Sequence, residues 1–292
     1  MKEIKLQLTV KTEPEKEQLG PGAVIAGIGS CFAQNVLERL HECGFPGSRN
    51  PCGIVYNAAS ITESLIRICR EKYFEPDDFF ESENLWCNWS LHGQMAEKTV
   101  TKSLSKANFS LKKFRETLVE ADMLIVTPSS SVIYMLKDTG KIVANCHKIP
   151  DNRFERRIMS YEQNLKMLDT AVKEVNKLNP TCRILLTLSP VRHYPGDPEL
   201  NSRSKANLMA ALRQCVDDNS AFCKYFPSYE IMHDELRDYR FYKEDMCHPT
   251  DQATEIVFRR FAETWFNKAA IEKLEGGIKA AKKAAHKPLK KR

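Results

Sequence analysis

The sequence of 292 residues predicts an α/β fold, in which a mostly parallel sheet carries helices on both faces. Short apolar runs typical of buried strands recur at 23–28, 123–126 and 184–188, and 224–227 is a further candidate. Amphipathic segments separate the runs, and turn-forming residues follow them. Strands that alternate with helices favour a parallel sheet, and ligands bind such sheets beyond the carboxyl ends of the strands. The loops after residues 28, 126, 188 and 226 are therefore the places to search.

The chain divides into three parts. Residues 1–19 alternate weakly and then become charged, which favours an N-terminal arm or edge strand. Residues 20–267 hold the predicted strands and form the main domain, and 268–292 form a basic tail rich in Ala and Lys. Within the domain, 71–120 fits the alternation least well, because acidic and aromatic residues precede a basic helical stretch. We expect an inserted lid there, above the site.

The first apolar run leads directly into a tight turn and a helix. The turn holds Gly29, Ser30 and Cys31, and after it apolar residues follow a helical stripe to Cys43. Near the other end, Thr250 is placed to cap a helix whose apolar stripe runs from Ala253 to Trp265.

The net charge of +6 resides in the tail. Residues 268–292 contain nine Lys and Arg against two Glu, so the rest of the chain is close to neutral. We therefore expect no nucleic-acid partner. The tail itself predicts a solvated helix or a disordered end, with nonspecific binding to acidic polymers as the lesser interpretation.

Ten cysteines are spread over the chain without regular spacing or a C-x-x-C pair. With no apolar segment long enough for a membrane span and no apolar core of a secretory signal near Met1, we expect a cytoplasmic protein with reduced, mostly buried thiols. No spacing of cysteine and histidine places two zinc ligands together, so neither a metal nor a cofactor is expected.

The glycine turn is open to two functional interpretations, dinucleotide binding and nucleophilic catalysis. Gly27 and Gly29 match the start of a dinucleotide fingerprint, but Phe32 stands where the third glycine belongs, and no acidic residue lies between Glu42 and Glu63 to bind a ribose. The alternative is a nucleophile turn that presents Cys31 or Ser30 at a helix start, where the helix dipole favours a thiolate. The structural interpretation of the same turn is a helix cap and a buried thiol.

A second motif lies at 245–249, where Asp245 precedes His248 by three residues. This spacing lets the carboxylate hold one ring nitrogen while the other faces a nucleophile. Alone, this spacing is a weak signal, and a surface carboxylate beside an ordinary loop histidine is the preferred interpretation.

Taken together, these motifs resemble the GSCFA family, named after the run found here at 29–33, within the wider SGNH (GDSL-like) hydrolase superfamily. The resemblance covers most of 22–266 and includes further motifs in the same order, at 50–57, 145–148, 189–193, 225–230 and 245–249. It implies a three-layer α/β/α sandwich with a flavodoxin-like sheet. It also implies hydrolysis of esters, often acetyl or acyl groups on sugars or lipids.

The resemblance also implies roles for particular residues. The superfamily's G-D-S turn, laid on this sequence, makes Cys31 the nucleophile, with Ser30 as helix cap. Ser30 is the alternative nucleophile if the turn is shifted by one residue. His248 would be the general base and Asp245 its orienting partner. The oxyanion hole would combine the N–H of Cys31, the N–H of Gly53 and a third donor; Asn145 is the candidate for it, and the alternative is that the third donor is absent.

Other polar residues are weaker candidates for substrate contacts. Arg192 and His193 follow a predicted strand and are as typical of a loop pair as of a site for an anionic or sugar-like substrate. His147 is a second possible base. Trp89 and His92 would line a sugar-binding cleft, or else belong to a small core within the predicted lid.

The sequence thus predicts an SGNH-type hydrolase or acyltransferase acting on a small-molecule or glycan ester. The alternative from another class is a non-catalytic protein that binds a glycan or small ligand on the same fold. Dinucleotide binding is a lesser alternative.

Overall fold

A five-stranded parallel sheet forms the centre of the protein. The structure, a computed structural model, describes residues 7–194 and 196–285. The strands lie in the order β2-β1-β5-β9-β10, and every neighbouring pair is parallel. Their bounds are Ile25–Gly29 for β1, Gly47–Arg49 for β2, Met123–Thr127 for β5, Arg183–Leu186 for β9 and Cys223–Tyr225 for β10.

This strand order is flavodoxin-like, and it reverses direction between β1 and β5. A crevice opens at such a reversal, beyond the carboxyl ends of the two strands. The four predicted strands correspond to β1, β5, β9 and β10. The sequence missed β2, because Gly47–Arg49 is short, polar and largely exposed.

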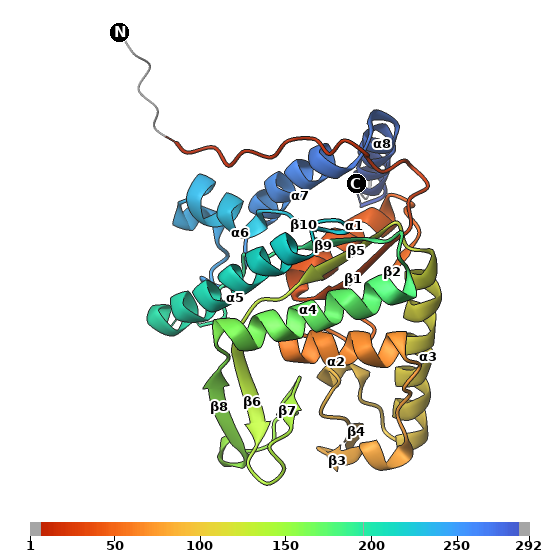
Figure 1. The fold of residues 1–292 in the computed structure, drawn as a ribbon, viewed down its shortest axis with the longest axis vertical. Coiled ribbons are helices and arrows are strands. Elements are labelled where there is room, and N and C mark those ends of the chain that lie inside the picture. The colour runs from red at the N-terminus through yellow and green to blue at the C-terminus, as the bar shows by residue number, and fades with distance from the viewer. Residues whose placement is uncertain (1–6, 195, 286–292) are drawn as a thin grey trace, which may run out of the picture.

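Helices cover both faces of the sheet, so the predicted three-layer α/β/α sandwich is confirmed (Figure 1). One face is covered by α1 (Cys31–Glu42), α7 (Asp251–Trp265) and α8 (Lys268–Ala285). The other is covered by α2 (Ala58–Cys69), α3 (Val100–Glu120), α4 (Tyr161–Leu178) and α5 (Pro198–Asp218).

The strand residues alternate between two apolar cores because successive side chains of a strand point to opposite faces. In β1, Ile25 packs with α1 and α7, whereas Ala26 and Ile28 pack against the opposite helices. Both cores are closed by large buried side chains, including Phe114 of α3 and Trp265 of α7. Burial on both faces explains why the strands are almost entirely apolar.

Two small antiparallel sheets lie beyond α2 and α4, on the side away from the central sheet (Figure 1). One pairs β3 (Phe80–Ser82) with β4 (Leu85–Cys87), and the other has the order β7-β6-β8. Its strands are Ile142–Val143, Val132–Leu136 and Phe154–Ile158. The sequence pattern does not predict them, because these strands mix polar and apolar residues and β7 has only two residues.

The segment 71–120, predicted as a lid, contains two kinds of structure. Its first part holds the β3–β4 hairpin and short 3₁₀ turns at Pro76–Asp78 and Gly93–Met95. Its second part is α3, whose buried side chains belong to the core under the sheet. A lid therefore stays a prediction for the first part, while α3 is part of the sandwich.

Both predicted ends pack against the same face. Residues 1–6 and 286–292 lie outside the described residues; the arm from 7 to 19 runs past α7, and its Leu19 forms a single bridge with Phe266 (Figure 1). The tail begins with α8, of which Ala270 and Leu274 are fully buried in the core. The tail is thus helical over its described part, as one of the two interpretations expected, but one side of the helix packs on the core instead of being solvated all round.

The turn between β1 and α1 depends on Gly29. Its backbone φ is +138°, a value that residues with a side chain rarely adopt. A Cβ here would lie 2.3 Å from the carbonyl oxygen of Thr127 in β5. Its N–H donates to Asn50 Oδ1 at 2.9 Å, and its carbonyl accepts from Val55 at 3.1 Å. The chain can therefore leave β1 sharply only because this residue has no side chain.

We expect Gly29→Ala to destabilise the fold by about 2–4 kcal/mol, since the methyl group meets backbone that cannot move aside. Gly93→Ala is the matched control, because nothing lies within 4 Å of a Cβ there; it should change stability by less than about 0.5 kcal/mol. Urea unfolding followed by circular dichroism measures both. Equal stabilities would contradict the packing described for the turn.

Candidate functional site

The β1–α1 turn separates Ser30 from Cys31. Ser30 is fully buried, and its backbone N–H donates to the carbonyl of Thr127 at 3.0 Å. It occupies the cap position of α1, but its hydroxyl makes no capping hydrogen bond and is buried without a partner. The expected capping role of its side chain is therefore wrong. Cys31, the first residue of α1, is only half-buried.

Burial and hydrogen bonding shift the pKa of the Cys31 thiol in opposite directions. Burial raises its pKa above the usual value, while hydrogen bonds from the backbone N–H groups of Cys31 and Phe32 lower it, as does the charge of Lys205. The effect of burial is larger, so the expected thiolate is not the resting form. The two N–H groups at the start of α1 nevertheless face the sulfur.

Asp245 and His248 form the pair that their spacing predicts. Asp245 Oδ2 lies 2.7 Å from His248 Nδ1, and its Oδ1 accepts from the backbone N–H groups of Cys247 and His248, each at 2.9 Å. Hydrogen bonds from the backbone and ring of His248 lower the pKa of Asp245 to about 2. The carboxylate therefore stays ionised and leaves the second ring nitrogen, Nε2, free.

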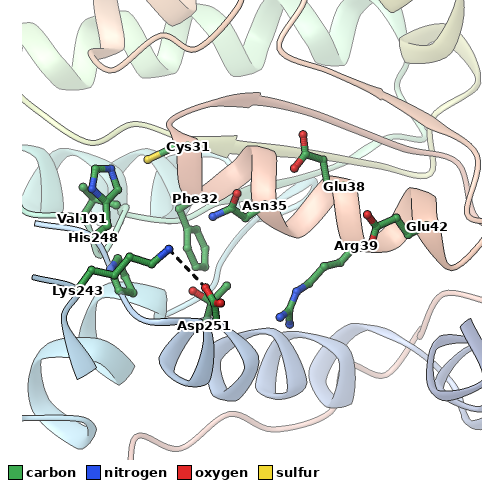
Figure 2. A pocket seen from close by; sticks show the side chains of 12 residues that line it. Cys31, Phe32, Asn35, Glu38, Arg39, Glu42, Val191, Lys243, His248 and Asp251 are labelled. Carbon is green, nitrogen blue, oxygen red and sulfur yellow. Dashed lines mark ion pairs between the residues drawn. The ribbon is translucent and has the colours of Figure 1, made fainter. Parts of the chain in front are cut away.

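Cys31 and His248 line the same cavity. Its volume is about 340 Å³, and it extends between α1 and α7 from these two residues toward Arg39 and Glu42. In Figure 2 the thiol of Cys31 points toward the ring of His248. Motifs from opposite ends of the sequence thus meet at one edge of the sheet.

Most of the cavity wall is polar. Its remaining residues are Phe32, Asn35, Glu38, Val191, Lys243, Pro249, Asp251 and Thr254. Lys243 forms an ion pair with Asp251 at 3.4 Å, drawn as the dashed line in Figure 2, and Arg39 pairs with Glu255 of α7 at 2.6 Å. A ligand in this cavity would meet hydrogen-bonding groups along its length.

Two of the three predicted oxyanion donors are not available in the structure. The N–H of Gly53 already donates to the carbonyl of Asn50 at 2.8 Å. Asn145 follows β7 in the outer sheet, where its Oδ1 accepts from the N–H of His147, and it does not line the cavity. Of the three predicted donors the N–H of Cys31 remains, and the N–H of Phe32 lies beside it at the thiol.

His147, Trp89 and His92 also lie away from the cavity. His147 is buried, with Nε2 2.8 Å from the carbonyl of Asn88. Trp89 stacks on Phe80 at 4.0 Å between ring centres, and His92 packs over Gly53. These contacts support the interpretation of the aromatic residues as a small core rather than a cleft.

Arg192 and His193 lie in the loop after β9, but they point to different places. The Arg192 guanidinium stacks on Tyr242 at 4.2 Å in a separate cavity of about 350 Å³ beside His233. The ring of His193 shares a hydrogen bond with the hydroxyl of Ser129. Burial lowers the pKa of His193 to about 3, so its ring is neutral.

Lys205 is the residue that the sequence analysis missed. It lies in α5 with only 3% of its surface exposed, and its Nζ donates to the carbonyl of Ser189 at 2.7 Å. Burial lowers its pKa to about 7, and the nearby side chains of Cys247 and Cys31 oppose this shift. The helical spacing of Lys205 from Leu208 and Leu212 places it on the apolar stripe of α5, but a single lysine on such a stripe does not indicate a chemical role.

In the part of the chain that the structure describes, no group of three or more His, Cys, Asp or Glu is arranged to hold a metal ion. All ten cysteines are free thiols, six of them buried. Over the same residues, no helix has the length and apolar character needed to cross a bilayer.

Comparisons with solved structures find distant similarity. A protein from Streptococcus pneumonia, titled as a candidate platelet activating factor, is 11% identical with a TM-score of 0.44, and the match covers 83% of each chain. An acetyl xylan esterase from the rumen bacterium Butyrivibrio proteoclasticus is 8% identical with a TM-score of 0.38, over 82% of this chain and 63% of that one. No curated protein sequence matches.

The family comparison is more direct, because it spans the whole sandwich from the first strand to α7. The model of the GSCFA family matches residues 24–261, a range that contains both the turn at Cys31 and the Asp245–His248 pair, and the chain therefore belongs to this family.

Proposed function

We propose that this protein is a hydrolase of the SGNH type that cleaves an ester, with Cys31 as nucleophile, His248 as general base and Asp245 as the group that orients His248. The observation that carries the proposal is the shared cavity: the Cys31 thiol and the His248 ring line it together, and a carboxylate 2.7 Å from the ring fixes His248. This is the arrangement of nucleophile, base and orienting acid needed for acyl transfer.

The burial of Ser30 supports Cys31 as the nucleophile. Ser30 has no exposed surface, whereas the thiol next to it borders the cavity. An ester that enters the cavity therefore meets the sulfur first. A nucleophilic Ser30 would require the turn to rearrange around Gly29, which is packed against Thr127.

The proposed reaction begins with a neutral thiol, because burial raises the pKa of Cys31. His248 Nε2 accepts the thiol proton as the sulfur attacks the carbonyl carbon, and Asp245 stabilises the imidazolium. The N–H groups of Cys31 and Phe32 donate to the developing oxyanion. His248 then protonates the leaving alcohol, and water, activated by the same ring, hydrolyses the thioester.

The scarcity of oxyanion donors favours the second candidate, a protein that binds a ligand without turnover. Gly53 uses its N–H internally, and Asn145 lies in the outer sheet. The polar cavity would then hold a glycan or another small polar ligand. Turnover of aryl acetates distinguishes the two, because a binding protein leaves them intact.

Substitutions at the turn test the nucleophile. Cys31→Ala should abolish turnover of acyl esters, because no other group in the turn reaches the cavity. Ser30→Ala should keep activity and lose no stability, since it removes a buried hydroxyl that has no hydrogen-bond partner. Steady-state kinetics on a panel of acyl esters, with melting curves for folding, measure both. Loss of activity in Ser30→Ala alone would assign the nucleophile to Ser30.

The Asp245–His248 pair gives a prediction for the pH dependence. Since the pKa of Asp245 is depressed to about 2, the pair is present above the usual carboxyl pKa and is lost only as the pH falls through about 2. A fall in activity toward acidic pH between pH 8 and 4 should therefore not reflect protonation of Asp245.

His248→Ala should lower kcat by about 10²- to 10⁴-fold, because it removes the proposed general base.

Asp245→Asn is the matched variant, since an amide oxygen can still accept from the backbone of Cys247 and His248. It should fold normally and lower kcat, because the charge that stabilises the imidazolium is gone. Activity equal to that of the unmodified protein across the pH range would contradict the orienting role.

A further inference from the structure

Lys205 is a buried amine that the proposed reaction does not use. Of the lysines and arginines that the structure describes, it is the one that is buried, and it has no ion pair with a carboxylate there. A charged amine in such surroundings lowers the stability of the fold, because burial penalises its charge and the carbonyl of Ser189 is its one strong hydrogen-bond acceptor among the described residues. The buried face of α5 holds the polar Asn201 and Ser204 before this lysine and apolar residues such as Leu208 and Leu212 after it.

The acceptor of Lys205 lies at the base of the loop after β9. Ser189 is fully buried; its carbonyl accepts from Lys205, and its N–H donates to the carbonyl of Pro128, after β5, at 3.0 Å. The Lys205 amine therefore joins α5 to the point where two strand-end loops meet. Val191, two residues further on, lines the cavity.

The same loop holds the histidine segment. Arg192 donates from its backbone N–H to the carbonyl of Cys247 at 3.0 Å, and the thiol of Cys247 donates to the carbonyl of Arg192. Cys247 precedes His248 directly. A continuous path of contacts thus runs from the amine of α5 through the loop to the ring beside Cys31.

We propose that Lys205 is a positioning residue: by fixing Ser189 it holds the loop 189–193, and through Cys247 it keeps the His248 ring in front of Cys31. This rests on the proposed function insofar as that pair performs the chemistry. Lys205 itself need not touch the substrate, and it does not line the cavity.

The surroundings of the amine are consistent with this role. Tyr229 lies with its ring 5.7 Å from Nζ. Cys31 and Cys247 lie near enough to the amine to oppose the lowering of its pKa, and the pKa values of His193 and His233 are lowered by burial and, to a smaller extent, by the amine. These are the groups that face the amine from α1, the loops and the segment after β10. None is a carboxylate that would make the lysine an ordinary structural ion pair.

Two variants separate the hydrogen bond from the charge. Lys205→Met removes both, while Lys205→Gln keeps an N–H donor. Lys173→Met is the control, since Lys173 is exposed on α4 and pairs only with Asp169. Each variant is characterised by kcat and KM on an aryl acetate, by its melting temperature, and by the rate at which iodoacetamide alkylates Cys31, followed by peptide mass mapping.

We expect Lys205→Met to lower kcat by about 10- to 100-fold with KM changed less than about twofold, because misplacing a catalytic group slows the chemical step. Alkylation of Cys31 should fall to the rate seen in His248→Ala, with partial recovery in Lys205→Gln. The melting temperature of Lys205→Met should stay the same or rise, most clearly at pH 6 to 7. The folded state depresses this pKa to about 7, so the charge penalises folding there and is relieved as the pH rises.

A lower melting temperature with unchanged kcat and alkylation would overturn the proposal and leave Lys205 a structural residue. If Lys205→Met does not fold, the kcat, the melting temperature and the Cys31 alkylation rate of Lys205→Gln test the proposal instead. Normal turnover in Cys31→Ala would instead overturn the proposed function, and alkylation of Cys31 would still test whether its reactivity depends on Lys205.

Discussion

The packing of the Gly29 backbone against the carbonyl of Thr127 is the constraint on which the site depends. It brings the ends of β1 and β5 so close that no side chain fits between them. The chain must then turn at once into α1, which buries Ser30 and leaves Cys31 at the helix start. Which of the two candidate side chains borders the cavity thus follows from backbone geometry at one residue.

The remaining members of the site reach this point by long-range contacts. His248 belongs to a loop more than two hundred residues further along the chain, and its ring is fixed locally by Asp245. The loop itself is held by the segment after β9 through Cys247. Because all these segments leave the sheet at one edge, the parallel topology brings them together without a dedicated domain.

The sequence predicted those parts of the fold that have strong local signals. Apolar runs identified the central strands, and the helix cap at Thr250 is present, with its side chain accepting from Ala253. The Asp245–His248 contact was predicted from the three-residue spacing taken together with the turn at Cys31. The strand β2 and the outer sheets escaped, because polar or very short strands are defined by pairing partners that sequence periodicity does not show.

The parts of the site that depend on burial could not be predicted. The pKa of Cys31 is raised because desolvation exceeds the effect of the helix N–H groups, and neither magnitude is visible in the turn itself. The oxyanion donors proposed for Gly53 and Asn145 failed for a similar reason, since their hydrogen bonds are made within the fold. Lys205 became apparent only once its burial and its contact with Ser189 were known.

Trapping the covalent acyl intermediate tests most directly whether Cys31 is the nucleophile. The protein is mixed with an aryl acetate, quenched in acid within the first turnovers, and digested for peptide mass mapping. If Cys31 is the nucleophile, an acetyl group appears on the peptide that contains Ser30 and Cys31, is labile to hydroxylamine as a thioester, and is absent in Cys31→Ala. An acetyl group retained in Cys31→Ala, or no acetylation of this peptide while the ester is turned over, would contradict this role of Cys31.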